Sequence, residues 1–171
     1  MKMIPLPPLE VLNELLKYDK DIGTFTWKVF RSNLAKAGDV ADNLMPDGYV
    51  SLCINDRQYR AHRIAYKMVY GHDPIGVMDH IDGNRANNKI SNLRVATLNQ
   101  NQWNSAVANH NTSGLKGVTW KKDTKKWAAQ LQYNGKKIWL GVYDDKHDAH
   151  QAYMKAAAEY FGEFANNGDG L

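Results

Sequence analysis

Residues 77–84 read Val77-Met78-Asp79-His80-Ile81-Asp82-Gly83-Asn84, and we expect the first part of the chain to be built around this stretch. Asp79 and His80 end a short apolar run that predicts a strand, and a Gly-Asn turn follows it. A second short strand is expected over 93–96, and Thr97 can cap the helix that comes next. The order strand, loop, strand, helix therefore brings an acid, an imidazole and several carboxamides toward one place.

The side chains of this stretch suit phosphodiester hydrolysis. The imidazole of His80 can take a proton from water, because its ordinary pKa is near neutrality. Carboxylate and carboxamide oxygens are hard ligands for a magnesium ion that keeps several waters and stabilises charge on a leaving oxygen. Asp79 and His80 are sequence neighbours, so they would point to opposite faces of one strand. A bulge or the end of the strand must then re-aim one of them.

These residues carry a resemblance to a known family. Asp79-His80, Asn92 and Asn101 match the successive elements of the HNH nuclease motif, the ββα-metal fold, in the form found in phage and intron-encoded homing endonucleases. The resemblance implies that His80 is the general base and that Asn92 braces the loop and helps orient the imidazole. It also implies that Asp79 and Asn101 hold one Mg²⁺ or Mn²⁺ per active site. Asn104 is an alternative to Asn101 as the second ligand.

Composition is compatible with a nucleic-acid partner. The chain has 171 residues, a formal net charge of +4 and a pI near 9.0. It has one cysteine, Cys53, so it can form no internal disulfide, which fits a reducing compartment. We expect no membrane association, because no stretch is long and apolar enough to span a bilayer and no signal peptide is evident. The resemblance places the protein in the cytoplasm of a bacterial or phage-infected cell.

Residues 1–74 are expected to form an extension in front of the nuclease core. It resembles the small sheet and helix that precede the core in many homing endonucleases. Arg63 belongs to its basic edge and, like Arg94 further along, is expected either to contact phosphate or to lie on a solvated face. His62 is interpreted as a structural or surface group, with metal ligation as the alternative. The predicted elements are a helix over 9–18, strands over 23–28, 48–54 and 58–61, a loop over 32–47 and a helix over 62–70.

The core is expected over 75–105, a polar linker over 106–113 and a separate unit over 114–167. Strands are predicted at 117–120, 126–133 and 136–143, with the hairpin signal Asn134-Gly135 and then an alanine-rich helix. This unit resembles the plant ethylene-response-factor type of DNA-binding domain. The residues that carry the resemblance are Lys116-Gly117-Val118, Lys126-Trp127-Ala128-Ala129, Trp139-Leu140-Gly141 and Phe164-Ala165-Asn166-Asn167.

The resemblance implies that the three-stranded sheet, and not the helix, enters the major groove. Lys, Thr and Gln stand where the plant domains have arginines that read guanine, so the preferred sequence should differ. Trp120 and Trp139 could pack either in the groove or in the core. The residues assigned to DNA contact in this unit are Thr119, Trp120, Lys121, Gln130, Gln132, Lys137 and Trp139.

Together these features predict an α+β protein: a ββα-metal core with a front extension, followed by a three-stranded antiparallel sheet packed on one helix. The expected function is site-specific hydrolysis of double-stranded DNA by a homing-type endonuclease. The alternatives are a non-catalytic DNA-binding regulator with a decayed core and a non-specific, toxin-like nuclease. One active site per chain predicts a monomer in solution that nicks DNA, and a double-strand break would need a dimer on DNA or two binding events.

Overall fold

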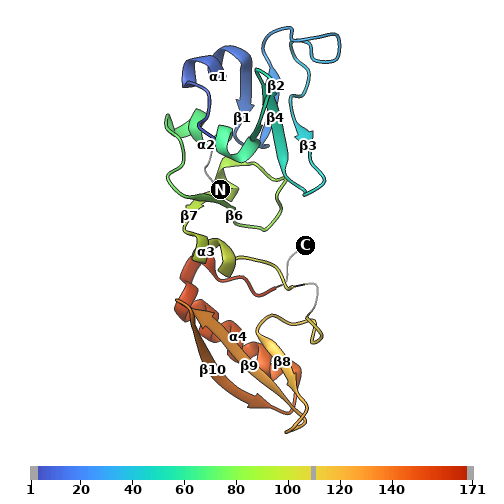
Figure 1. The fold of residues 1–171 in the computed structure, drawn as a ribbon, viewed down its shortest axis with the longest axis vertical. Coiled ribbons are helices and arrows are strands. Elements are labelled where there is room, and N and C mark those ends of the chain that lie inside the picture. The colour runs from blue at the N-terminus through green and yellow to red at the C-terminus, as the bar shows by residue number, and fades with distance from the viewer. Residues whose placement is uncertain (1–3, 109–110, 169–171) are drawn as a thin grey trace. The chain divides into compact units, whose positions relative to one another are not determined.

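A computed structural model describes residues 4–108 and 111–168 (Figure 1). The chain divides into two compact units between Ala96 and Thr97. Each unit combines helices with small antiparallel sheets, which confirms the α+β class. Among the described residues, no helix combines the length and the apolar character needed to cross a bilayer.

The first unit contains three small antiparallel sheets and two α-helices. The sheets pair β1 with β2, β4 with both β3 and β5, and β6 with β7. In chain order the elements are α1 (Leu9–Leu15), β1 (Leu16–Asp19), β2 (Thr24–Trp27), β3 (Asn43–Leu44), β4 (Val50–Ile54), β5 (Arg57–Arg60), α2 (Ala61–Tyr70), β6 (Val77–His80), η1 (Ile90–Asn92) and β7 (Leu93–Ala96).

The predicted helix over 9–18 is wrong in its last three residues. The helix ends at Leu15, and Leu16–Asp19 is a strand that pairs with Thr24–Trp27. Leu16 is buried while Lys17 is exposed, so the alternation of a strand replaces the helical spacing of the leucines. The predicted loop over 32–47 also contains the short strand β3.

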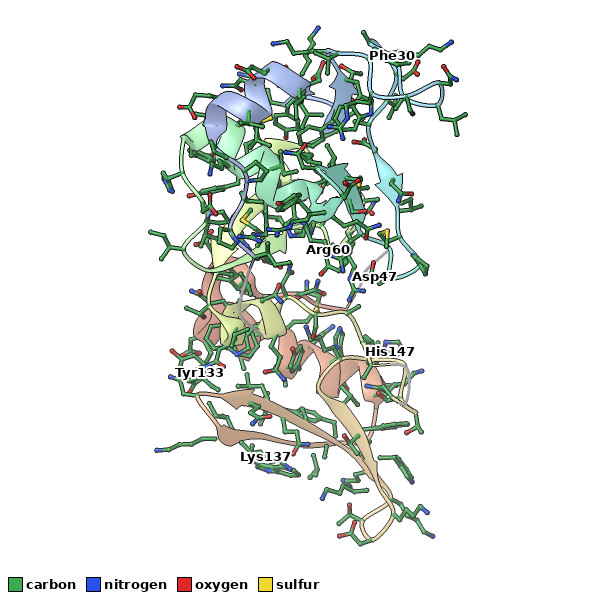
Figure 2. All side chains as sticks on the ribbon, turned by 45° about the horizontal axis from the view of Figure 1, so that its top comes forward. Phe30, Asp47, Arg60, Tyr133, Lys137 and His147 are labelled. Atoms are coloured by element: carbon green, nitrogen blue, oxygen red, sulfur yellow. The ribbon has the colours of Figure 1, made fainter. Side chains whose placement is uncertain are left out.

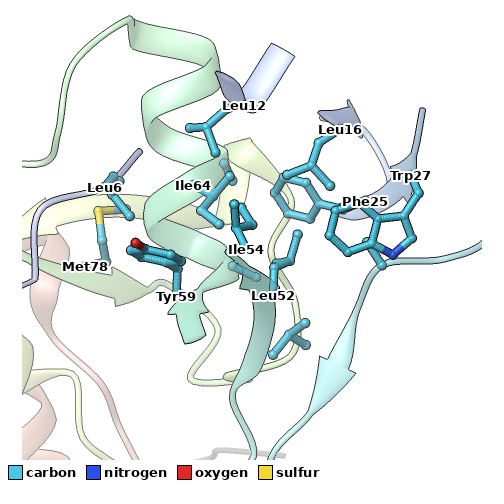
Figure 3. Close-up of a cluster of buried hydrophobic side chains, with 14 of the residues drawn as sticks. Leu6, Leu12, Leu16, Phe25, Trp27, Leu52, Ile54, Tyr59, Ile64 and Met78 are labelled. Carbon is cyan, nitrogen blue, oxygen red and sulfur yellow. The ribbon is translucent and has the colours of Figure 1, made fainter. Parts of the chain in front are cut away.

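One hydrophobic core holds the first unit together (Figure 3). Leu12 and Phe25 are fully buried in it, and Ile64 brings helix α2 onto it. Met78 of β6 and Leu93 of β7 belong to the same cluster. The β6–β7 hairpin is therefore fixed to the front segment by a shared core.

The second unit is a three-stranded antiparallel sheet with one long helix. The strand order is β10-β9-β8, and α4 contacts all three strands. Trp103 stacks on Phe161 with ring centroids 4.7 Å apart, which ties helix α3 to α4. The elements are α3 (Leu98–Trp103), β8 (Val118–Lys121), β9 (Lys126–Tyr133), β10 (Lys136–Tyr143), α4 (Lys146–Phe161) and η2 (Gly162–Phe164).

Small residues allow α4 to lie close to the sheet. Ala149 and Ala157 are fully buried on its inner side. Gly117 has φ +75°, and a Cβ there would come within 2.0 Å of the Tyr153 ring, so this position requires glycine. In the turn between β9 and β10, Asn134 and Gly135 both have positive φ, as the predicted hairpin turn requires.

The division at Ala96 and Thr97 falls inside the predicted nuclease core over 75–105. The hairpin lies in the first unit, and the helix α3 that follows it lies in the second. The predicted boundaries at 74, 105 and 113 stay a prediction.

Candidate active site

Asp79 and His80 are the last two residues of strand β6. The pairing of β6 with β7 runs without a shift in register from Val77 to His80, so the described hairpin has no bulge. Of the two features expected to re-aim one side chain, the bulge is therefore absent from the described hairpin, and the end of the strand stays a prediction. Both side chains are buried, with 4% of each residue exposed.

Asp79 forms an ion pair with Arg94. The two residues are directly opposite in the β6–β7 ladder, and Nε of Arg94 donates to Oδ2 of Asp79 over 2.8 Å. The side chain of Arg94 is only 13% exposed and that of Asp79 only 5%, so water screens this pair little. Arg94 was expected to reach a phosphate or to lie in solvent, whereas here it lies beside the predicted metal ligand.

His80 is oriented by Asn88, which is buried and whose role the sequence did not reveal. Nε2 of His80 lies 3.1 Å from Oδ1 of Asn88, and Nδ2 of Asn88 donates to the carbonyl of Ala86 over 3.3 Å. Because the amide nitrogen is turned to Ala86, the oxygen must face His80, and Nε2 must carry the proton. This tautomer leaves the imidazole lone pair on Nδ1.

The pKa of His80 is lower than that of an ordinary histidine. Burial is the largest cause, because it disfavours the charged imidazolium. The hydrogen bond that His80 donates to Asn88 and the carboxylates of Asp82 and Asp79 act in the opposite direction and raise it. His80 is therefore neutral near pH 7, in the form that can accept a proton.

Asn92 ties together the two ends of the loop between β6 and β7. Its Oδ1 accepts from the backbone N–H of Asp82 over 3.1 Å. Its Nδ2 donates to Oδ1 of Asp82 and to the carbonyl of Asn87, both over 2.9 Å. These contacts are those of a residue that braces the loop, while the described contact that orients His80 comes from Asn88.

The β1–β2 hairpin contacts this loop at Asn88 and Lys89. The hydroxyl of Tyr18 donates to the carbonyl of Asn88 over 2.6 Å. Gly23 lies so close that a Cβ there would be 2.4 Å from the backbone nitrogen of Lys89 and 2.6 Å from the carbonyl carbon of Asn88. The front segment thus helps to fix Asn88, and through it His80.

His62 and Tyr49 pack around His80. The ring of His62 meets the ring of His80 edge to face at 5.2 Å, and the Tyr49 centroid is 5.4 Å and 5.9 Å from the two rings. Burial lowers the pKa of His62 to about 3, and Nδ1 of His62 has no hydrogen-bond partner among the described residues. The interpretation of His62 as a structural group agrees with this packing, although the sequence did not place it beside His80.

Helix α3 carries the remaining predicted ligands, and it lies in the second unit. Thr97 accepts from the backbone N–H of Gln100, and the Gln100 side chain accepts from the N–H of Thr97, so the predicted cap is confirmed as a full capping box. Asn101 is half-buried on this helix. Asn104 is the C-terminal cap residue, and its Oδ1 accepts from Nδ2 of Asn166 over 3.2 Å.

The predicted DNA-contact residues fall on two faces of the sheet. The register places Gln130 opposite Trp139 and Gln132 opposite Lys137 on the face away from α4. Thr119 and Lys121 alternate onto the same face, and Nζ of Lys121 lies 5.7 Å from the Trp139 ring centroid. Trp120 instead pairs with Trp127 on the other face, their rings edge to face at 4.8 Å.

A cavity of about 420 Å³ lies within the second unit and is lined by residues from both faces of the sheet. Carboxamides from two elements line it: Asn99 and Gln102 of α3, and Gln130 and Gln132 of β9. Lys116 is also part of its wall, but its ammonium donates to the carbonyls of Trp103 and Ser105. Burial lowers the pKa of Lys116 to about 8, so this lysine supports the fold of the unit.

The other predicted phosphate contact, Arg63, is held by neighbouring groups. Its Nη1 donates to the carbonyl of Ile4 over 2.9 Å, and its Nη2 is 3.8 Å from Asp73. No cluster of three or more His, Cys, Asp or Glu side chains suited to a metal occurs in the part of the chain that the structure describes. A site built from a single carboxylate and carboxamide oxygens would not form such a cluster.

Comparison with known proteins supports the HNH part of the resemblance. Residues 59–103 match the model of a family described as HNH endonuclease. The matched range includes strand β6, the loop, strand β7 and helix α3. No solved structure matches the chain.

Two curated relatives are similar to part of the chain. Protein 3.8 of Escherichia phage T7 is 40% identical over 78 residues, which are 45% of this chain and 64% of that protein. A protein of Acanthamoeba polyphaga mimivirus named uncharacterized HNH endonuclease L560 is 37% identical over 106 residues, 61% of this chain and 54% of that protein. The chain thus spans less than two thirds of the length of either relative.

Proposed function

We propose that this protein is a metal-dependent DNA endonuclease of the homing type, with His80 as its general base. The observation that carries the proposal is the contact between His80 and Asn88, which leaves the lone pair on Nδ1 of an imidazole that burial keeps neutral near pH 7. The HNH family match over residues 59–103 supports the same chemistry. Double-stranded DNA is the proposed substrate and partner.

In the proposed reaction a water molecule attacks the phosphorus atom of a phosphodiester while His80 Nδ1 takes its proton. A new P–O bond forms and the P–O bond to the leaving sugar oxygen breaks. Asn88 keeps Nε2 protonated throughout, which prevents the ring from turning its other nitrogen to the water. Because the pKa of His80 is lowered, the base stays active somewhat below pH 6.5.

Asp79 is proposed to hold one Mg²⁺ or Mn²⁺. A buried carboxylate next to a neutral imidazole is a hard oxygen donor that suits either ion. When bound, such an ion stabilises negative charge on the leaving oxygen. The second oxygen is assigned to Asn101 on the sequence resemblance, and the engagement of Asn104 with Asn166 favours that choice over Asn104.

We propose that the sheet of the second unit enters the major groove and reads the target sequence there, as in the ethylene-response-factor type of DNA-binding domain. Four of the seven assigned residues are exposed on its outer face, namely Thr119, Lys121, Gln132 and Lys137. A fifth, Gln130, is half-buried on the same face. Trp139 lies on this face with 54% of its surface exposed. Trp120 is on the opposite face, so we assign it to packing against Trp127.

Mapping of cleavage positions on the DNA that flanks the gene tests this function against its rivals. A homing enzyme gives a single position, and replacement of Gln130 and Gln132 by alanine makes cleavage less selective while His80 remains intact. Cleavage at many unrelated positions by the unaltered protein would support a non-specific nuclease. Tight binding with no cleavage on any DNA would support a regulator with a decayed core.

A further inference from the structure

Two arginines converge on one tyrosine beside the candidate active site. The guanidinium of Arg60 lies 4.7 Å from the ring centroid of Tyr49, and that of Arg85 lies 4.9 Å from it. Arg60 ends strand β5, whereas Arg85 belongs to the loop between β6 and β7. We refer to Arg60, Arg85 and Tyr49 as the arginine platform.

The platform adjoins His80. The Tyr49 ring is 5.9 Å from the His80 ring, and the charge of Arg85 is close enough to contribute to the lowered pKa of His80. All four residues belong to the first unit. The platform therefore offers positive charge next to the imidazole that would act on the scissile phosphodiester.

Asp47 holds the two guanidiniums in place. Its carboxylate accepts from Nη1 and Nη2 of Arg60 over 3.2 and 2.7 Å, and Figure 2 labels these two residues. Its backbone carbonyl accepts from Nη1 of Arg85 over 3.0 Å. Arg85 has no ion-pair partner among the described residues, and it is exposed. The carboxylate of Asp47 pairs with Arg60, while Arg85 is bound by a neutral backbone carbonyl, which leaves an excess of positive charge at the exposed Arg85.

We propose that the arginine platform binds a backbone phosphate of the DNA substrate next to the bond that is cut. A planar guanidinium is suited to phosphate because it presents paired N–H donors, and stacking on an aromatic ring fixes its plane before the ligand arrives. The platform would set the position of the strand relative to His80 without reading its sequence. This inference rests on the proposed nuclease function for its biological role, but the binding step is measurable by itself.

The test is the salt dependence of DNA binding by the full chain in EDTA, with a short fluorescein-labelled duplex of arbitrary sequence as the probe. Wild type is compared with Arg60→Gln, Arg85→Gln and the double variant. Each lost phosphate contact should lower the slope of log K against log salt by about 0.9. Arg31→Gln is the matched control, because Arg31 also stacks on an aromatic ring, 4.9 Å from the Trp27 centroid, outside the platform.

A further variant guards against a trivial loss of folding. Asp47→Asn removes the carboxylate that pairs with Arg60 and lies near the charge of Arg85, so it should tighten DNA binding, an effect that misfolding does not produce. Equal slopes for wild type and the double variant, or weaker binding by Asp47→Asn with an unchanged melting temperature, would overturn the platform. A protein that shows the expected slopes but never cleaves DNA would refute the nuclease and leave the platform standing.

Discussion

Oδ1 of Asn88 lies 3.1 Å from Nε2 of His80, and this contact decides which imidazole nitrogen can act as a base. Asn88 is itself fixed from three sides. Its amide nitrogen donates to Ala86, its carbonyl accepts from Tyr18, and its backbone lies against Gly23. Asn88 is thus placed to control which tautomer of His80 is present.

Asn88→Ala should lower kcat with little change in KM. Without the carboxamide the imidazole can populate the wrong tautomer and other orientations, so part of the 10²- to 10⁴-fold contribution of a general base should be lost. We expect a decrease of about tenfold or more in single-turnover cleavage. The matched control is Asn84→Ala, since Asn84 is an exposed residue of the same loop. An equal loss in both variants would contradict the assigned role of Asn88.

Arg94→Met should destabilise the first unit and make its unfolding free energy depend on a bound divalent metal ion. Loss of Arg94 removes the ion-pair partner of the buried Asp79 carboxylate, a change that typically costs about 3–5 kcal/mol of unfolding free energy. A divalent ion bound by Asp79 should restore part of this loss. Denaturant unfolding with and without Mg²⁺ measures both effects.

The exposed ion pair of Arg60 with Asp47 is the comparison for that experiment. Its side chains are 40% and 46% exposed, so breaking it in Arg60→Gln should cost much less stability than Arg94→Met does. If the Arg94 and Arg60 variants lose equal stability, or if Mg²⁺ leaves Arg94→Met unchanged, Asp79 does not have the role assigned to it.

Gly23→Ala should reduce both stability and activity. A methyl group at this position must displace the backbone at Asn88 and Lys89, in addition to the strain of a side chain at φ +80°. Gly38→Ala separates the two effects, because Gly38 has φ +91° but no other described atom within 4 Å of its Cβ. Thermal unfolding and single-turnover cleavage should both show a larger loss for Gly23→Ala. A larger loss for Gly38→Ala would show that the hairpin does not support the loop.

The first unit should lose stability in acid because of His62. The folded-state pKa of His62 is about 3, below the ordinary value near 6.5, so below pH 6.5 the unfolded chain binds a proton that the folded chain does not. Stability is therefore retained above pH 6.5 and falls by up to about 1.4 kcal/mol per pH unit as the pH drops toward 3. His80, whose pKa is also lowered, acts in the same direction.

The pH dependence of urea unfolding measures this effect. His62→Phe should flatten the dependence below pH 6.5, whereas replacement of the exposed His72 by phenylalanine should leave the wild-type curve. A curve for His62→Phe that coincides with wild type would mean that His62 is charged in the folded protein.

Local patterns predicted much of the fold. The strand over 93–96, the cap at Thr97 and the turn at Asn134-Gly135 are all found, because each depends on a few adjacent residues. The helix predicted over 9–18 fails at Leu16, since pairing with Thr24–Trp27 outweighs the helical spacing of the leucines.

The surroundings of the site could not be predicted in the same way. Asn88 is one of several asparagines in the loop, and its contact with His80 depends on how the loop folds back over the strand end. The ion pair of Asp79 with Arg94 requires the strand register, and the meeting of Arg60 and Arg85 on Tyr49 requires three separate segments. Such long-range contacts leave no local signal in one sequence.

The central claim is that His80 acts as the base of a metal-dependent DNA nuclease. Its most direct test is the nicking of a supercoiled plasmid that carries the DNA flanking the gene, by wild type and by His80→Ala, in Mg²⁺ and in EDTA. We predict nicking by wild type in Mg²⁺, none in EDTA, and a decrease of about 100-fold or more in His80→Ala. Equal nicking by the two proteins, or none by wild type in Mg²⁺ or Mn²⁺, would contradict the claim.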